Sequence, residues 1–206
     1  MFRIKHFIKQ SWLLIVSAFV FGLLIAVTNA ALSGRITGNE EDELNNLMRS
    51  LIVDAKDFEK VIKEAQIPGG KGKVNQTDIY RAIGSGNRNV GFAFVAVGAG
   101  FADKIKLVIA VDGDCERFFG FKVLSSNETP GFGSRIKEDE FGGQFRGVPT
   151  SVLEVVKTGD VEKIDSQIVA ISGATVSSEA VVKIFNTYIG EIKRQLQEKG
   201  LISNGK

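Results

Sequence analysis

Residues 89–126 read NVGFAFVAVGAGFADKIKLVIAVDGDCERFFGFKVLSS, and this stretch decides the fold. Val90 to Val97 and Ile105 to Val111 are dense in residues that favour β-strands, and residues 117–125 alternate loosely between apolar and polar side chains. The short segments GAG and DGD mark turns between these runs. Three strands joined by short turns predict an antiparallel meander.

The end of the chain, EAVVKIFNTYIGEIKRQLQEK at residues 179–199, is predicted to form an amphipathic helix. Its apolar residues recur at helical spacing and share one face; they are Val181, Ile184, Phe185, Tyr188 and Ile192. Residues 150–159, TSVLEVVKTG, favour one more strand. We therefore expect an α+β fold, an antiparallel sheet with packed helices.

Residues 39–65, NEEDELNNLMRSLIVDAKDFEKVIKEA, predict a helical stretch. Asn39 can cap it, and the acidic residues that follow suit the positive end of the helix dipole. The sequence Pro68-Gly69-Gly70 predicts a break after it. Two roles stay open for this stretch: it stands a globular domain off a membrane, or it packs on that domain.

The amino-terminal segment predicts one transmembrane helix over residues 11–33, SWLLIVSAFVFGLLIAVTNAALS, which contains no charged residue. Arg3, Lys5 and Lys9 precede it, so the positive-inside rule places residues 1–10 in the cytoplasm and the main domain on the extracytoplasmic side. A cleaved signal peptide is the alternative, because small residues end the apolar run. The run is longer than a typical secretory core, which favours a retained anchor.

Composition excludes several kinds of chemistry. The 206-residue chain has a formal net charge of +2 without a basic stripe, so nothing favours a nucleic-acid partner. One cysteine and one histidine rule out an internal disulfide and a zinc site built from both residue types. Cys115 is interpreted as a plain turn or strand residue. We expect no metal site, and any redox chemistry requires a bound cofactor.

The first motif is AISGATVSS, residues 170–178, directly before the predicted last helix. A Gly-Ala turn that leads into a helix presents free backbone N–H groups at the positive end of the helix dipole, which suits a phosphate. Thr175 would hold its hydroxyl beside that seat, able to bind a phosphate or be esterified by one. A plain helix cap is the alternative reading of these hydroxyls.

The second motif is SSNETPGFGSRI, residues 125–136, at the start of a long glycine-rich loop. A long loop inside a compact domain is often functional. Glu128, Thr129 and Phe132 lie on a turn made flexible by glycine, against which a flat aromatic ring with polar edges could lie. A surface Ω-loop is the alternative.

The anchor, the strand that leads into ETPGFG, the later QFRG and the final SGAT before a helix occur in this order at this spacing. Together they resemble the covalent FMN-binding domain family, above all the G subunit of Rnf-type ion-translocating oxidoreductases. The C subunit of the sodium-translocating NADH:quinone reductase is a near relative. The resemblance covers residues 90 to the end, and the anchor. It implies an α+β FMN-binding domain.

The resemblance also implies a set of cofactor-binding residues. A flavin transferase would join one FMN through its phosphate to the hydroxyl of Thr175, a phosphoester, with the preceding SGA turn as the phosphate seat. The ring would lie against the ETPG loop and the strand before it. The implied residues are Thr175, Ser172, Gly173, Ala174, Leu124, Glu128, Thr129, Pro130, Gly131, Phe132 and Gly133. Val169 stands where the family commonly has an aspartate.

These inferences divide the chain into a cytoplasmic end (1–10), a transmembrane helix (11–33), a helical connector or packing region (34–85) and the covalent FMN-binding domain (86–200). The implied role is a single-pass flavoprotein of the inner membrane that relays electrons among the other subunits of an ion-translocating complex. It is part of a translocase, and no residue is expected to turn over a substrate independently.

Other functions stay open. The chain could be the C-type subunit of the quinone reductase or a stand-alone FMN electron carrier. A function of a different class is an anchored scaffold protein that has no cofactor.

Overall fold

The computed structural model describes residues 2–69 and 74–203. The chain divides into two compact units, Met1–Glu43 and Leu44–Lys206. Helix α1 (Phe2–Leu51) makes up the first unit, and its last residues belong to the second. Within the described ranges, α1 is the one helix long and apolar enough to cross a membrane by length and composition, with a mean hydropathy of 2.4 in its apolar window. This finding agrees with the predicted span; the side on which each end lies stays a prediction.

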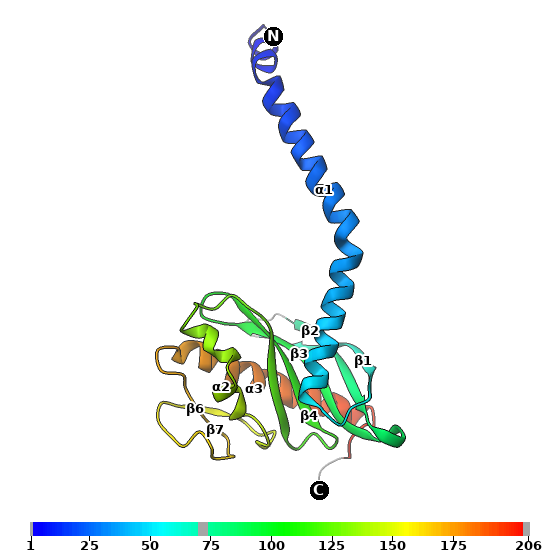
Figure 1. The fold of residues 1–206 in the computed structure, drawn as a ribbon, viewed down its shortest axis with the longest axis vertical. Coiled ribbons are helices and arrows are strands. Elements are labelled where there is room, and N and C mark those ends of the chain that lie inside the picture. Colours follow the sequence, from blue (N-terminus) through cyan, green and yellow to red (C-terminus); the bar gives the residue numbers. More distant parts are fainter. Residues whose placement is uncertain (1, 70–73, 204–206) are drawn as a thin grey trace. The chain divides into compact units, whose positions relative to one another are not determined.

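The second unit is built on a five-stranded sheet in the order β1-β2-β3-β4-β5, with every neighbouring pair antiparallel (Figure 1). Its strands are β1 (Asp57–Pro68), β2 (Val74–Ile83), β3 (Asn89–Ala99), β4 (Lys104–Asp112) and β5 (Phe118–Ser126). The three strands predicted over 89–126 are β3, β4 and β5, so the predicted meander and the α+β fold class are confirmed.

Short elements fill the chain between the sheet and the last helix. They are η2 (Ser85–Asn87), η3 (Gly133–Lys137), α2 (Asp139–Gly143), β6 (Glu154–Val156) and β7 (Gln167–Val169), followed by α3 (Thr175–Glu198). β6 pairs with β7 in parallel, so the strand predicted over 150–159 is confirmed for three residues only. The predicted terminal helix is confirmed by α3.

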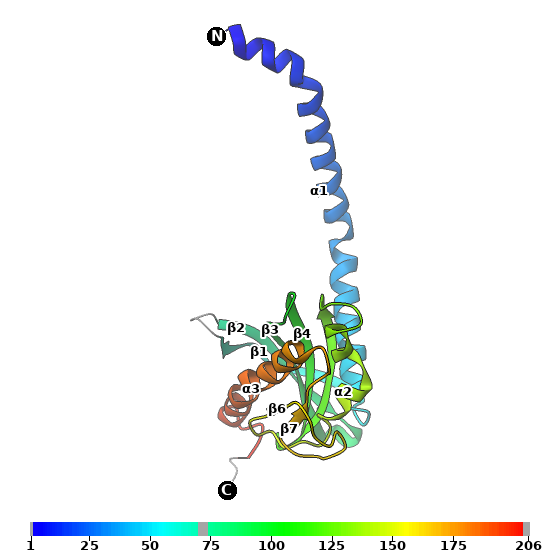
Figure 2. The same cartoon turned by 90° about the vertical axis from the view of Figure 1, so that its left-hand side faces the viewer.

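The two faces of the sheet carry separate apolar cores, because alternate residues of a strand point to opposite faces. On one face, Phe92 and Phe94 of β3 pack with the buried stripe of α3. On the other face, Met48 of α1 and Ile52, which follows its last residue, pack on small side chains such as Ala93 and Ala110. Figure 2 shows the sheet between α3 and the end of α1.

Helix α3 is tied to β3 by two contacts. The backbone N–H of Val97 donates a hydrogen bond to the Tyr188 hydroxyl at 3.0 Å. This hydroxyl is buried, and its burial raises the pKa of Tyr188. A Cβ at Gly98 would lie 2.4 Å from Ile184, so only glycine allows α3 this close to the strand. These contacts hold α3, and with it the SGAT turn, against the sheet.

The helix predicted over residues 39–65 is correct as far as Leu51 and wrong from Asp57, where β1 begins. The predicted cap at Asn39 is also wrong, because Asn39 lies inside α1, which begins at Phe2. Ion pairs between β1 and β2 join Lys60 to Asp78 and Arg81 to Glu59 at 2.6 Å, and such cross-strand pairs stabilise a sheet. The charged run that looked helical is the exposed part of an edge strand. β1 ends at Pro68, and Gly70 of the predicted break lies outside the described residues.

Candidate functional site

A cavity of about 510 Å³ lies where the two predicted motifs meet, and we call it the motif cavity. Three segments that are distant in the sequence form its wall: the turn after β3, the loop after β5 and the start of α3. The lining residues are Phe101, Thr129, Phe132, Gly133, Gly173, Ala174, Thr175, Val176 and Ser177. Folding therefore brings six of the predicted site residues around one space.

The SGAT turn presents unpaired backbone donors to this cavity. Ala174 donates its N–H to the Ile171 carbonyl at 2.9 Å, and Gly173 has a φ of +80°, a conformation that favours glycine. In the described part of the chain, no hydrogen bond is found from the N–H groups of Thr175, Val176 and Ser177. These are the first N–H groups of α3, at the positive end of its dipole.

Thr175 is the first residue of α3, and its side chain is half-buried in the cavity wall. Within the described residues its hydroxyl makes no hydrogen bond. Neither Thr175 nor Ser172 caps the helix: the N-cap position is Ala174, which has no side-chain cap bond. Ser172 is exposed and does not line the cavity. A capping role therefore does not explain Thr175, whose hydroxyl is left for another partner.

The conformation of the SGAT turn is held by Ser178, which is fully buried in the first turn of α3. Its hydroxyl donates to the Ala174 carbonyl and accepts from the Ile171 N–H, both at 3.0 Å. A serine inside the helix therefore fixes the turn from behind, while the first N–H groups of α3 receive no capping side chain.

The ETPG loop makes a tight turn in the wall of the same cavity. The Thr129 carbonyl accepts hydrogen bonds from the N–H groups of Phe132 and Ser134, and Gly131 has a φ of +76°. This turn holds the Phe132 ring 57% exposed beside Gly173, where a Cβ would lie 3.4 Å from the ring. Pro130 and Gly131 shape the turn without lining the cavity.

Glu128 lies behind the cavity wall and is only 5% exposed. Its Oε1 accepts a hydrogen bond from the Ala102 N–H at 3.0 Å, and its Oε2 accepts one from the Ser177 hydroxyl. Both carboxylate oxygens bind groups of the protein itself, so a direct contact between Glu128 and a flavin ring stays a prediction. Glu128 joins all three segments that form the wall.

Leu124 is predicted to lie near the ring, but the structure does not bring it to the motif cavity. It packs with Met48 and Ile52 in the core on the α1 side of the sheet, whereas its neighbour Val123 packs on the α3 side. The strand alternation therefore directs Leu124 away from the other predicted residues.

Two residues of the site were missed by the sequence reasoning. Phe101, 67% exposed, lines the cavity from the turn after β3, which the sequence shows only as a glycine-flanked turn. Gln144 of the QFRG segment binds both backbone groups of Val169 with its side-chain amide, at 2.8 and 3.2 Å. It thereby ties the long loop to the strand before the SGAT turn. No sequence signal singles out either role.

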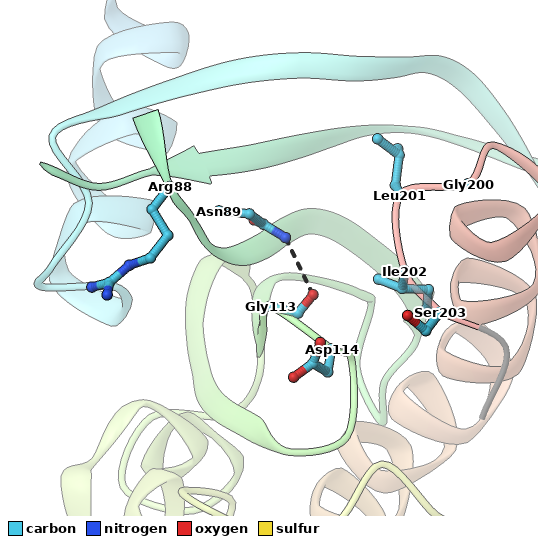
Figure 3. Close-up of a pocket in the computed structure, with 8 residues that line it drawn as sticks. All are labelled: Arg88, Asn89, Gly113, Asp114, Gly200, Leu201, Ile202 and Ser203. Atoms are coloured by element: carbon cyan, nitrogen blue, oxygen red, sulfur yellow. Dashed lines mark hydrogen bonds between the residues drawn. The ribbon is translucent and has the colours of Figure 1, made fainter. Parts of the chain in front are cut away.

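A second cavity, of about 570 Å³, contains none of the predicted site residues (Figure 3). We call it the C-terminal cavity. It is lined by Arg88, Asn89, Gly113, Asp114, Gly200, Leu201, Ile202 and Ser203. Two of these residues are joined directly: Asn89 donates a hydrogen bond to the Gly113 carbonyl at 3.2 Å. Across the described ranges, no three His, Cys, Asp or Glu side chains are grouped to hold a metal ion.

Comparison with known families places the motif cavity inside a characterised domain. A family model described as "FMN-binding domain" matches residues 100–190. This span contains every lining residue of the motif cavity and only two residues of the C-terminal cavity, Gly113 and Asp114.

Curated relatives align over most of the chain. The G subunit of the proton-translocating ferredoxin:NAD(+) oxidoreductase complex of Clostridium ljungdahlii is 32% identical over 170 residues, covering 82% of this chain and 83% of the relative. The G subunit of the ion-translocating oxidoreductase complex of Methanosarcina acetivorans is 28% identical, covering 93% and 97%.

A solved structure confirms the fold. The C subunit of the Na(+)-translocating NADH-quinone reductase of Parabacteroides distasonis superimposes with a TM-score of 0.57 at 21% identity, over 83% of this chain and 98% of that one. Shewanella oneidensis NqrC gives a TM-score of 0.56 at 19% identity, over 72% of both chains. At these identities the likeness concerns the fold alone.

Proposed function

The chain belongs to the G-subunit family of ion-translocating oxidoreductase complexes, and on that premise we propose that it is a membrane-anchored flavoprotein that bears FMN as a phosphoester on Thr175. Its role is to relay electrons within an Rnf-type complex. The observation that carries the proposal is the juxtaposition, in one cavity, of the Thr175 hydroxyl with the unpaired N–H groups that begin α3.

The residues of the motif cavity fit an FMN group. A phosphate requires hydrogen-bond donors, and the N–H groups of Thr175, Val176 and Ser177 supply them at a helix N-terminus. A ring system requires apolar surface, which Phe101 and Phe132 supply in the cavity wall. The volume of about 510 Å³ lies in the range of small-molecule sites.

The start of α3 and the aromatic side chains of the motif cavity have different roles in binding FMN. The start of α3 would hold the phosphate. A flavin transferase would form the Thr175 Oγ–P bond by breaking the P–O bond that joins the FMN phosphate to the rest of the flavin donor, and this leaving group would depart with the hydroxyl proton. The aromatic side chains orient the ring. The flavin supplies transfer of one or two electrons when bound. A covalent tether keeps the group from dissociating into an extracytoplasmic compartment.

Helix α1 is proposed as the retained anchor, with its basic amino-terminal end in the cytoplasm. It would keep the flavin domain near integral subunits of the complex, which are the proposed partners. Copurification tests this part: the full chain should be isolated with integral subunits, and an isolated flavoprotein would instead indicate a stand-alone carrier.

Peptide mass spectrometry tests the covalent bond. Trypsin should release residues 164–183, which contain the hydroxyls of Ser166, Ser172, Thr175, Ser177 and Ser178. We expect this peptide to carry the mass of FMN less one water, with fragment ions that place the adduct on Thr175. Protein from the native host, which supplies the transferase, should stay yellow after denaturation.

Matched variants sharpen that experiment. Thr175→Ala should abolish the adduct, and Thr175→Ser should keep it because the hydroxyl remains. Ser172→Ala is the control, since Ser172 is exposed and outside the cavity; its adduct should persist. An adduct that survives in Thr175→Ala would show that another residue carries the flavin. If protein from the native host is colourless, the alternative of an anchored domain without a cofactor is favoured.

A further inference from the structure

Glu128 is a buried carboxylate without a cationic partner. It is 5% exposed, and among the described residues no salt bridge reaches it. Its two oxygens each accept one hydrogen bond, from the Ala102 N–H and from the Ser177 hydroxyl. Two donors on two acceptor oxygens are the arrangement that suits an ionised carboxylate.

Two glycines make room for this group. A Cβ at Gly100 would lie 2.4 Å from Oε1 of Glu128, and a Cβ at Gly133 would lie 2.7 Å from its Oε2 and 2.6 Å from the Ser177 hydroxyl oxygen. No side chain larger than hydrogen fits at either position without displacing the carboxylate. The fold therefore builds a closely fitting slot for one negative charge.

The slot lies directly behind the motif cavity. Gly133 and Ser177 both line that cavity. The Ser177 hydroxyl donates to the carboxylate, and a Cβ at Gly133 would lie 2.7 Å from it, so one residue separates the charge from the space. The positive end of α3 helps to stabilise the charge, as Ser177 lies in the first turn of this helix. A hydrogen bond spreads a charge but does not cancel it.

We propose that the ionised Glu128 carboxylate sets the reduction potential of the flavin in the motif cavity, by holding it lower than the site would give without this charge. The inference rests on the proposed function, since it requires FMN there. Its physical basis is Coulomb's law: an electron added near a fixed negative charge costs energy, and the cost grows where water is excluded. Glu128 acts on the flavin through this field.

Glu128→Gln isolates the charge from the shape. The glutamine carbonyl can still accept from the Ala102 N–H, and its NH₂ can donate to the Ser177 oxygen, which then acts as acceptor. The slot stays filled and both hydrogen bonds remain. Only the negative charge is lost, so a change of potential in this variant reports the charge.

The experiment is a spectroelectrochemical titration at pH 8 of the full flavin-loaded chain and three variants. Glu128→Gln should shift the midpoint potential to a more positive value. Glu179→Gln, which removes an exposed carboxylate in the first turns of α3, should shift it less because water screens that charge. Ser177→Ala keeps the Glu128 charge and removes one donor, so its potential should stay or become more negative.

Three results would overturn the inference: an unchanged potential in Glu128→Gln, an equal shift in Glu179→Gln, or a positive shift in Ser177→Ala. The last of these tests the inference even if Glu128→Gln does not fold. Mass spectrometry of the parent separates this failure from failure of the proposed function. A parent chain without adduct refutes the proposed function. A flavin-loaded parent whose midpoint potential is the same as that of Glu128→Gln refutes only the role of the charge.

Discussion

The two cavities of the second unit lie at the two ends of α3 and differ in chemistry more than in size. The start of the helix lines part of the motif cavity, of about 510 Å³, and the residues that follow its end line part of the C-terminal cavity, of about 570 Å³. At the start, the N–H groups of Thr175, Val176 and Ser177 have no partner in the described chain.

At the other end the backbone is closed. Gly200, with a φ of +67°, donates its N–H to the Gln197 carbonyl, and Leu201 donates to the Leu196 carbonyl, each at 2.9 Å. This is the Schellman pattern, which satisfies the last carbonyls of a helix. The comparison teaches that unsatisfied backbone groups and a buried charge, rather than volume, distinguish a candidate binding site here.

The strongest test of this contrast compares one glycine from each cavity. Gly133→Ala would bring a Cβ within 2.7 Å of Glu128 and Ser177, disrupting a buried hydrogen bond, whereas at Gly113 the nearest atom is 3.4 Å away. We expect Gly133→Ala to lower the free energy of unfolding by about 3 kcal/mol and Gly113→Ala by less than about 1 kcal/mol. Thermal unfolding followed by circular dichroism measures both.

Equal losses in those two variants would contradict the view that Glu128 sits in a closely fitting slot. Gly142→Ala, in α2, where a Cβ meets nothing within 4 Å, serves as a control for substitution of a glycine between β5 and β6.

Two side-chain amides offer a second comparison. Gln144 bonds the N–H and carbonyl of Val169 at 2.8 and 3.2 Å, and Asn89 bonds the Gly113 carbonyl and the Gly91 N–H at 3.2 and 3.3 Å. Gln144→Ala leaves two backbone groups without partners in a more buried place, so we expect a loss of about 2 kcal/mol, against about 1 kcal/mol for Asn89→Ala.

Chemical denaturation of both variants gives these differences. Flavin loading is the second readout: it should fall in Gln144→Ala, because Gln144 holds the strand that enters the SGAT turn, and stay normal in Asn89→Ala. A normal adduct in an unstable Gln144→Ala would separate the stability of the loop from the assembly of the site.

The third pair changes glycines of similar backbone conformation. Gly173 and Gly200 have φ values of +80° and +67°, so alanine at either position should cost about 1 kcal/mol of stability. Only Gly173→Ala should reduce the yield of the adduct, because Gly173 shapes the turn before Thr175. Adduct mass spectrometry beside thermal unfolding checks both statements, and an equal loss of adduct in Gly200→Ala would contradict them.

Periodicity in the sequence predicted the parts whose apolar pattern is regular. The alternation in residues 89–126 and the helical stripe of α3 identify the sheet and the last helix, because burial of one face requires those spacings. The edge strand β1 was read as helix, since its charged residues are paired with β2, and a pairing partner cannot be read from one segment alone.

The residues of the candidate site also divide into those that the sequence predicts and those that it does not. The residues of the two motifs were predicted from local turn chemistry and from the family resemblance, and six of them line one cavity in the structure. Leu124, Phe101 and Gln144 were misplaced or missed because their surroundings are set by strand alternation and by contacts between distant segments. Local chemistry can be predicted from a sequence, whereas the face on which a side chain lies requires the register of the whole sheet.

The last test has the smallest expected effect and concerns Cys115, next to Asp114 of the C-terminal cavity. The thiol is buried, and burial raises its pKa to about 12. At pH 8 only about one thiol in 10⁴ would be ionised, so iodoacetamide should label the native protein very slowly and the unfolded protein rapidly.

The sign of the accompanying pH effect follows from the direction of the shift. Because the folded state holds the thiol protonated, its contribution to stability is complete below the ordinary cysteine pKa near 9 and is lost as the pH rises toward 12. Raising the pH from 7 to 8 should therefore leave this contribution unchanged. Rapid labelling of the native protein at pH 8 would mean that the turn beside the C-terminal cavity opens readily. The lining of the C-terminal cavity would then open and close in solution. The two cavities would have to be compared by how often they open, and no longer by the hydrogen bonds at the two ends of α3.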